Sequence, residues 1–218
     1  MSGLALYGHP FSSYTWKALI PLYANGTAFE FRPVDPEHSE NGAFLARTHP
    51  AGKFPVLVDG DAVVIEATSI VEYLALHHSG PAPLIPAEPA RAATARMLDR
   101  VFDNYVMHNM NRVVVAHLVG GDSPDRAEIA AAKEALLRAY RWLEGWLGAN
   151  EVPPHVSLVT CAAAPSLFYA DWVERIPADC PRLAALRAEV LALPAVARCV
   201  DDARPYRSYF PPGAPDRD

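Results

Sequence analysis

The sequence predicts two parts, an α/β domain followed by an all-helical domain. Three observations lead to this prediction. Strand signals are confined to residues 4–65, a Gly-Pro-Ala-Pro break follows at 80–83, and long stretches of helical periodicity dominate the rest. With 218 residues the chain is long enough for one large or two modest domains.

The first strands and helix form a β-α-β unit. An apolar run at 4–7 ends at a turn and predicts a strand. Ser12 and Ser13 are good N-caps for a helix that stops at Asn25-Gly26, and residues 29–34 alternate like a strand. Because a helical crossover joins them, the two strands should be parallel.

A hairpin and a helix complete this domain. Residues 55–58 and 62–65 are strand-like runs separated by Asp59-Gly60-Asp61, and the segment before them is interpreted as a polar loop. A helix is expected over 68–76. The order βαβ-ββα predicts a mixed four-stranded sheet in a domain at 1–80, with a linker at 81–89.

Residues 90–218 are predicted to form an all-α bundle. Helical stretches cover 91–118 and 125–147, and shorter helices should begin near Ser157, Pro181 and Pro194. In the second stretch, four large apolar side chains fall on one face: Leu136, Tyr140, Leu143 and Leu147.

Composition narrows the function classes. The net charge of -6 is spread along the chain without a basic cluster, which argues against nucleic acid or an anionic membrane as partner. Cys161, Cys180 and Cys199 are odd in number and widely spaced, which predicts neither disulfides nor a metal site. The N-terminus carries no signal-like segment, and the apolar run at 113–119 is short, so a cytoplasmic location is expected.

The segment 6–17 (LYGHPFSSYTWK) combines a strand end, a turn and a helix start. The first backbone N–H groups of a helix have no partner within it and carry partial positive charge, so they stabilise a thiolate or a phosphate. The alternative is that Ser12 or Ser13 only caps the helix.

Two further segments suit an extended peptide. If the Phe54-Pro55 bond is cis, the backbone before it can pair with such a peptide; the alternative is a turn that starts the strand. Glu66 closes a strand where a helix begins, so the carboxylate and the helix start together could hold a zwitterionic amino acid. Alternatively, Glu66 only complements the helix dipole.

Together these segments resemble the cytosolic glutathione transferase family, and the resemblance covers essentially the whole chain. The motifs L-Y-x4-S-S before W-K, G-K-x-P-x-L-x-D-G and E-x-x-x-I-x-x-Y-L are similar to those of bacterial serine-type members of the zeta (maleylacetoacetate isomerase) and theta classes. The resemblance implies a thioredoxin-like first domain, with glutathione as co-substrate and no metal.

The resemblance also implies roles for individual residues. Ser12 would donate its hydroxyl to the glutathione sulfur, with Ser13 and Tyr7 as alternates. The expected glutathione-binding residues are Lys53, Phe54, Pro55, Glu66, Ala67 and Thr68. The expected electrophile pocket comprises His9, Phe11 and one face of the first long helix: Tyr105, His108, Asn109 and Arg112. The alternative for that face is a polar contact between helices or subunits.

Two positions depart from the family pattern. Ala67 stands where a serine is usual, which removes a hydroxyl contact to the γ-glutamyl carboxylate unless Thr68 compensates. Thr160 stands at the aspartate position of the capping box that begins at Ser157, a loss of about 1 kcal/mol by analogy with other cap substitutions.

The expected function is activation of the glutathione thiol for attack on a small hydrophobic or electrophilic molecule, in a homodimer as the resemblance implies. Glutathione-dependent isomerase, dehalogenase or disulfide reductase chemistry is an alternative within enzymes. A transferase-like protein that binds ligands or partners without turnover is the alternative outside them; Ala67 mildly favours it, whereas Ser12, Pro55 and Glu66 together argue against it.

Overall fold

The computed structural model describes residues 3–218. It contains a four-stranded sheet in the order β2-β1-β3-β4, with β1 parallel to β2 and antiparallel to β3, and with β3 and β4 joined as an antiparallel hairpin. This is the mixed sheet that the sequence predicts. The strands are β1 (Ala5–Gly8), β2 (Glu30–Pro33), β3 (Val56–Asp59) and β4 (Ala62–Ile65).

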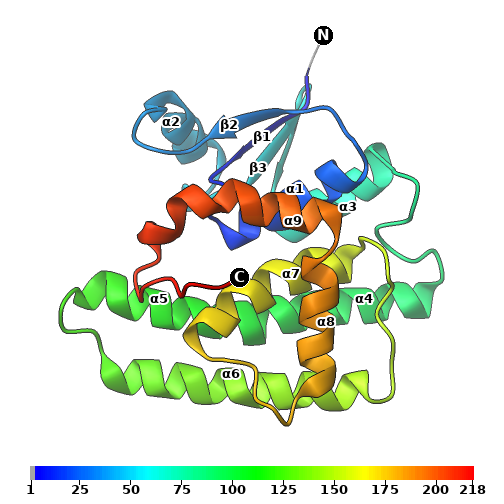
Figure 1. Cartoon of the computed structure of the whole chain (residues 1–218). Helices are drawn as coiled ribbons and strands as arrows, with labels where there is room; N and C mark the ends of the chain where they lie inside the picture. The colour runs from blue at the N-terminus through cyan, green and yellow to red at the C-terminus, as the bar shows by residue number, and fades with distance from the viewer. Residues whose placement is uncertain (1–2) are drawn as a thin grey trace.

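Helices cover both faces of this sheet, as Figure 1 shows. Successive side chains of a strand point to opposite faces, so Leu4 and Leu6 pack with α1 (Ser13–Ala24) and α3 (Ala67–His77). Ala5 and Tyr7 pack instead with Leu45 of α2 (Ser39–Thr48). The end of β1 therefore leads directly into α1 on one side of the sheet.

Helix α2 corrects the expectation of a polar loop between the second and third strands. The helix buries only Asn41 and Leu45, and its N-cap His38 makes no capping bond through its side chain. Because a single buried apolar residue and an unusual cap leave little periodicity or start signal, the sequence pattern did not reveal this helix.

The remaining helices form the predicted bundle, drawn from green to red in Figure 1. The first long stretch is continuous but passes through a π-helical segment, and in the second stretch the large apolar side chain of Trp142 is 48% exposed. The elements are α4 (Pro89–Val101), the π-helix η1 (Phe102–Met107), α5 (His108–Gly120), α6 (Arg126–Leu147), α7 (Leu158–Val173), α8 (Pro181–Leu191), α9 (Pro194–Ala203) and the 3₁₀ helix η2 (Arg204–Tyr209).

Helix α7 lies at the centre of the molecule, and all of its residues are buried. It packs against α1 from the sheet domain and against α4 and α8 of the bundle, so one apolar core extends across both parts. Trp16 of α1 contacts the rings of Phe168 and Tyr169 on α7. This continuous packing holds the start of α1 in a defined position relative to the bundle.

The three cysteines are free and buried. Within residues 3–218, no helix combines the length and apolar character that crossing a bilayer requires.

Candidate functional site

Ser12 is the N-cap of α1. Its backbone is extended, with φ -89° and ψ 124°, and its Oγ accepts a hydrogen bond of 3.3 Å from the backbone N–H of Thr15. Because the oxygen accepts, the hydroxyl hydrogen is left to donate elsewhere. The N–H groups of Ser13 and Tyr14 have no acceptor among the described residues. The start of α1 thus presents a hydroxyl donor and unpaired N–H groups.

A cleft of about 350 Å³ opens at this helix start, between the sheet domain and the bundle. Its polar groups come mainly from the β1–α1 turn, whereas apolar and aromatic side chains from the bundle form the opposite wall. Such a cavity suits a ligand with one anionic atom and one apolar partner. The lining residues are His9, Phe11, Ser12, Ser13, Tyr14, Phe54, Met110, Asn111, Val114, Tyr169, Tyr209 and Phe210.

The structure separates the three hydroxyl groups suggested for the thiol. Ser12 and Ser13 both line the cleft, although Ser13 is only 9% exposed. Tyr7 does not line it, since its ring stacks on Phe44 of α2 with centroids 4.3 Å apart. Its hydroxyl oxygen accepts a 2.6 Å bond from Arg32 Nη1. Tyr7 therefore belongs to the other face of the sheet.

The Phe54-Pro55 peptide bond is cis, which agrees with the condition set by the sequence motif. Val56 begins the ladder opposite Tyr7, so Phe54 lies just outside the sheet and lines the cleft. Its backbone N–H and C=O have no backbone partner among the described residues. Lys53, one residue earlier, is exposed. An extended peptide could therefore pair with the backbone at Phe54.

Glu66 marks the start of α3 and has an unusual backbone. Its φ of 69° lies in the left-handed region, where a residue other than glycine costs about 1–3 kcal/mol. Its side chain is 73% exposed, with Oε1 3.8 Å from Nε2 of His49, and it does not cap the helix. The N–H groups of residues 67–69 have no acceptor in the described chain. Strain and unpaired donors at one point are typical of a binding site.

Thr68 does not supply the hydroxyl that Ala67 lacks. Its Oγ1 accepts a 2.8 Å bond from Lys17 Nζ and donates a 3.0 Å bond to Asp99 Oδ2. Ala67 itself is buried. The start of α3 therefore offers backbone N–H groups without a free side-chain hydroxyl from residues 67 and 68.

Comparison with known proteins identifies the family. The N-terminal domain model of glutathione S-transferases matches residues 6–82. Glutathione S-transferase 3 of Zea mays is 32% identical over 158 residues, which cover 69% of this chain and 70% of the maize protein. The chain belongs to the glutathione S-transferase family.

Two further comparisons extend over nearly the whole chain. A probable maleylacetoacetate isomerase of Vibrio cholerae is 28% identical and covers 94% of this chain and 99% of its own length. The solved structure of glutathione S-transferase III in its apo form is 29% identical, with a TM-score of 0.76, over 91% of this chain and 96% of the other. The predicted fold class and family are thereby confirmed.

His9 and Phe11 belong to the β1–α1 turn of this transferase and line the cleft. His9 Nδ1 accepts a 3.1 Å bond from the backbone N–H of Phe11, and the ring meets Tyr206 edge-on at 4.7 Å. Burial lowers the pKa of His9, and Asp35 opposes this shift only in part. The imidazole is therefore neutral near pH 7, with its proton on Nε2.

The predicted polar face of the first long helix does not reach the cleft. Asn109 donates a 2.7 Å bond to the backbone oxygen of Tyr105, and Arg112 pairs with Glu128 of α6 at 2.6 Å. Tyr105 and His108 are exposed. Tyr105 lies in the π-helical η1, whereas His108, Asn109 and Arg112 lie in the regular helix α5, and none of the four lines the cleft. The Arg112–Glu128 pair is a polar contact between helices, as the alternative for this face states, and the role of the four residues in binding an electrophile stays a prediction.

The neighbouring face of α5 lines the cleft through Met110, Asn111 and Val114. The apolar pair Met110 and Val114, at i and i+4, was a signal for this face, but the prediction was based on the neighbouring polar residues instead. Tyr169 of α7 also lines the cleft, and its hydroxyl donates a 2.8 Å bond to the backbone oxygen of Phe11. No local sequence pattern could place Tyr169, because it lies 158 positions from its partner.

A larger cavity of about 640 Å³ lies beside the linker, where Arg91, Trp146 and His155 line it. It contains none of the predicted site residues. Within residues 3–218, no three His, Cys, Asp or Glu side chains are grouped so that they could hold a metal ion. The smaller cleft at Ser12 is therefore the candidate site, because predicted site residues, including Ser12 and Phe54, line it.

Proposed function

We propose that this protein is a glutathione transferase in which Ser12 and the start of α1 stabilise the glutathione thiolate for attack on a small electrophile. One observation carries the proposal: Ser12 caps α1 through its oxygen, so its hydroxyl hydrogen is available to the cleft between the two parts of the chain. The bundle side of the cleft is where the electrophile would bind.

The interaction energies available from Ser12 and the helix start are large enough to lower the pKa of the glutathione thiol. A cysteine-type thiol has a pKa near 8.5, so only a few per cent is thiolate at neutral pH. Lowering the pKa by about two units requires roughly 2.7 kcal/mol. A hydroxyl bond to a charged acceptor contributes about 1.5–3 kcal/mol, and a helix N-terminus about 0.3–1 kcal/mol more. Ser12 with the start of α1 meets this requirement without a general base.

The rest of the tripeptide would extend along the sheet end. The free backbone of Phe54 would pair with the cysteinyl residue, and Lys53 would lie near the glycyl carboxylate. Glu66 would hold the γ-glutamyl ammonium group, and the unpaired N–H groups of residues 67–69 would hold its carboxylate. The strained φ of Glu66 supports this assignment, since such strain is concentrated at ligand-binding positions.

The electrophile would bind between His9, Phe11 and the apolar wall formed by Met110, Val114 and Tyr169. Glutathione-dependent isomerisation is a second candidate, because the Vibrio cholerae relative named a probable maleylacetoacetate isomerase aligns over 99% of its length. In that reaction the thiolate would add to a conjugated double bond, allow rotation and leave again. Activity assays with halogenated and with disulfide substrates would test the dehalogenase and disulfide reductase alternatives.

We also expect a cytoplasmic homodimer. Exposed apolar side chains on β4, α3 and α4 support self-association: Val63, Leu76 and Met97 are 49%, 79% and 42% exposed. Sedimentation of the purified protein tests this expectation, and a monomer at all concentrations would contradict it.

The deciding experiment is a titration of bound glutathione by ultraviolet thiolate absorbance across pH, on the parent and on Ser12→Ala. The pKa of the bound thiol should be depressed in the parent and return toward its ordinary value in the variant. Ser13→Ala is the matched control and should retain the depressed pKa. A depressed pKa that persists in Ser12→Ala and is lost in Ser13→Ala would transfer the role to Ser13. Absence of glutathione binding to the parent would favour a non-catalytic protein.

A further inference from the structure

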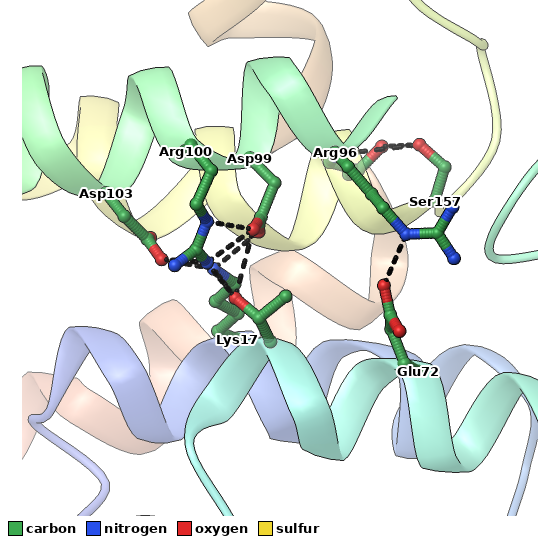
Figure 2. Close-up of polar contacts among 9 residues, drawn as sticks. Lys17, Glu72, Arg96, Asp99, Arg100, Asp103 and Ser157 are labelled. Carbon is green, nitrogen blue, oxygen red and sulfur yellow. Dashed lines mark hydrogen bonds and ion pairs between the residues drawn. The ribbon is translucent and has the colours of Figure 1, made fainter. Parts of the chain in front are cut away.

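A cluster of charged side chains, most of them buried, lies between α4 and the helices α1 and α3, as Figure 2 shows. Lys17 of α1 is 1% exposed, and its Nζ lies 2.5 Å from Asp99 Oδ1 and 2.7 Å from Asp103 Oδ2. The same Nζ donates to Thr68 Oγ1 of α3. The cluster therefore joins α1, α3 and the α4–η1 junction.

Arg100 contributes the second positive charge of this cluster. Its Nε donates a 2.9 Å bond to Asp99 Oδ2, and its Nη2 lies 2.8 Å from Asp103 Oδ2. Nη2 also contacts Thr68 Oγ1. In contrast, Nη1 has no partner among the described residues, and the side chain is 51% exposed. Arg100 therefore places a free N–H edge beside the second residue of α3.

The charges within the cluster balance. Lys17 and Arg100 carry two positive charges, and Asp99 and Asp103 carry two negative charges. An incoming carboxylate would therefore meet no excess negative charge from these four groups. Guanidinium groups suit carboxylates because their N–H groups form charge-assisted hydrogen bonds in a planar fork.

We propose that Arg100 recognises the α-carboxylate of the γ-glutamyl residue and thereby replaces the hydroxyl that Ala67 lacks. The inference rests on the proposed function. It follows from three observations. Ala67 carries no donor in its side chain, and the Thr68 hydroxyl already bonds Lys17 and Asp99. Arg100 contacts that hydroxyl through Nη2, which leaves Nη1 without a partner among the described residues, and the N–H groups of residues 67–69 are unpaired. Arg100 acts in substrate recognition and is separate from the thiol chemistry at Ser12.

The test compares glutathione with (4-aminobutanoyl)-cysteinyl-glycine, which has the same chain without the α-carboxylate. The dissociation constants of both are measured by calorimetry on the parent and on Arg100→Met. The parent should prefer glutathione by roughly 10- to 100-fold, the range of one hydrogen bond to a charged group. Arg100→Met should lose the part of this preference that the guanidinium supplies, by weakening glutathione alone, and should keep the part that the N–H groups of residues 67–69 supply.

Arg96 provides a matched control one helical turn earlier on α4. Its side chain is 50% exposed, and it also bridges α4 to α3, through a 2.7 Å bond to Glu72. Figure 2 shows that Glu72 lies away from the start of α3. Arg96→Met should therefore keep the preference for glutathione.

A second set of variants guards against simple misfolding. Arg100→Lys keeps the charge of the cluster and should lose less of the preference than Arg100→Met. Adding Ala67→Ser to Arg100→Met should recover part of it, because the hydroxyl returns. An unchanged preference in Arg100→Met and Arg100→Lys, or an equal loss in Arg96→Met, would overturn the inference alone. Failure of the parent to bind glutathione would overturn the proposed function and this inference together.

Discussion

The starts of α1 and α3 offer the same kind of anion site by opposite means. Helix α1 is capped locally, because Ser12 accepts the N–H of Thr15 within the same turn. Helix α3 has no side-chain cap, and Glu66 before it holds a left-handed backbone. The first start is stable by itself, whereas the second depends on groups from α1 and α4.

This difference indicates where tertiary structure is needed. A serine cap forms wherever the helix forms, so the capping of α1 itself requires no group from the bundle. The start of α3 is held in place by Lys17 and Asp99, which come from distant parts of the chain. Variants that affect one start and spare the other can therefore test the comparison.

Removing Lys17 should have the largest effect, because it breaks the support of α3. Lys17→Met leaves Asp99 and Asp103 with Arg100 as the only cation of the cluster, and breaking a buried pair costs about 3–5 kcal/mol. Urea denaturation measures this loss of unfolding free energy. Lys133→Met, which removes a partly exposed pair with Glu174, should cost less than about 1 kcal/mol. Equal losses would contradict the comparison.

Substitutions of Ser12 separate capping from thiol activation. Ser12→Gly should keep all but a few tenths of a kcal/mol of stability, whereas Ser12→Ala should lose about 1 kcal/mol. Both remove the hydroxyl, so both should lower kcat/KM with a chloroaromatic electrophile by roughly 10- to 100-fold at neutral pH.

The control for these variants is another serine cap. Ser157→Ala removes the cap of α7, which does not line the cleft, and should reduce stability while the pKa of the bound thiol stays depressed. If Ser12→Gly retained full activity, the hydroxyl of Ser12 would have no role in catalysis.

Glu66→Gly should sharpen the contrast at α3. Glycine adopts a φ of 69° without steric cost, so the unfolding free energy should rise by about 1 kcal/mol. The affinity for glutathione should fall, because the carboxylate that holds the ammonium group is removed. Thermal unfolding and calorimetry measure the two effects. Unchanged binding would show that the Glu66 carboxylate does not hold the ligand, and a loss of stability would show that its backbone is not strained.

The smallest expected effect concerns His9 in the turn before α1. Burial lowers the pKa of His9 in the folded protein, so below about pH 6.5 the unfolded state binds more protons there. The stability contributed by neutral His9 should therefore be present above that pH and be lost as the pH falls. His9→Gln should show a weaker decline between pH 7 and pH 5 in urea denaturation. Parallel curves would exclude this linkage.

Much of the fold was predictable because its signals are local. Ser12 and Ser157 cap α1 and α7, and the Asp59-Gly60 turn joins β3 and β4, as their residue types predict. Helix α2 was not predicted, since it buries only Asn41 and Leu45 and so shows little apolar periodicity. The face of α5 that lines the cleft was not predicted, since its apolar pair Met110 and Val114 lies beside more conspicuous polar residues. Among the predicted site residues, those that line the cavity are His9, Phe11, Ser12, Ser13 and Phe54.

The sequence by itself determined the family motifs, the order of the four strands, and a serine N-cap at position 12 or 13, because each depends on neighbouring residues. Only the tertiary structure decided that the Thr68 hydroxyl bonds Lys17, that Arg100 contacts the same hydroxyl, and that Tyr169 donates a hydrogen bond to the backbone of Phe11. These contacts join residues that are distant in the chain. They form only when α1, α4 and α7 pack into one core, and no local pattern specifies that packing.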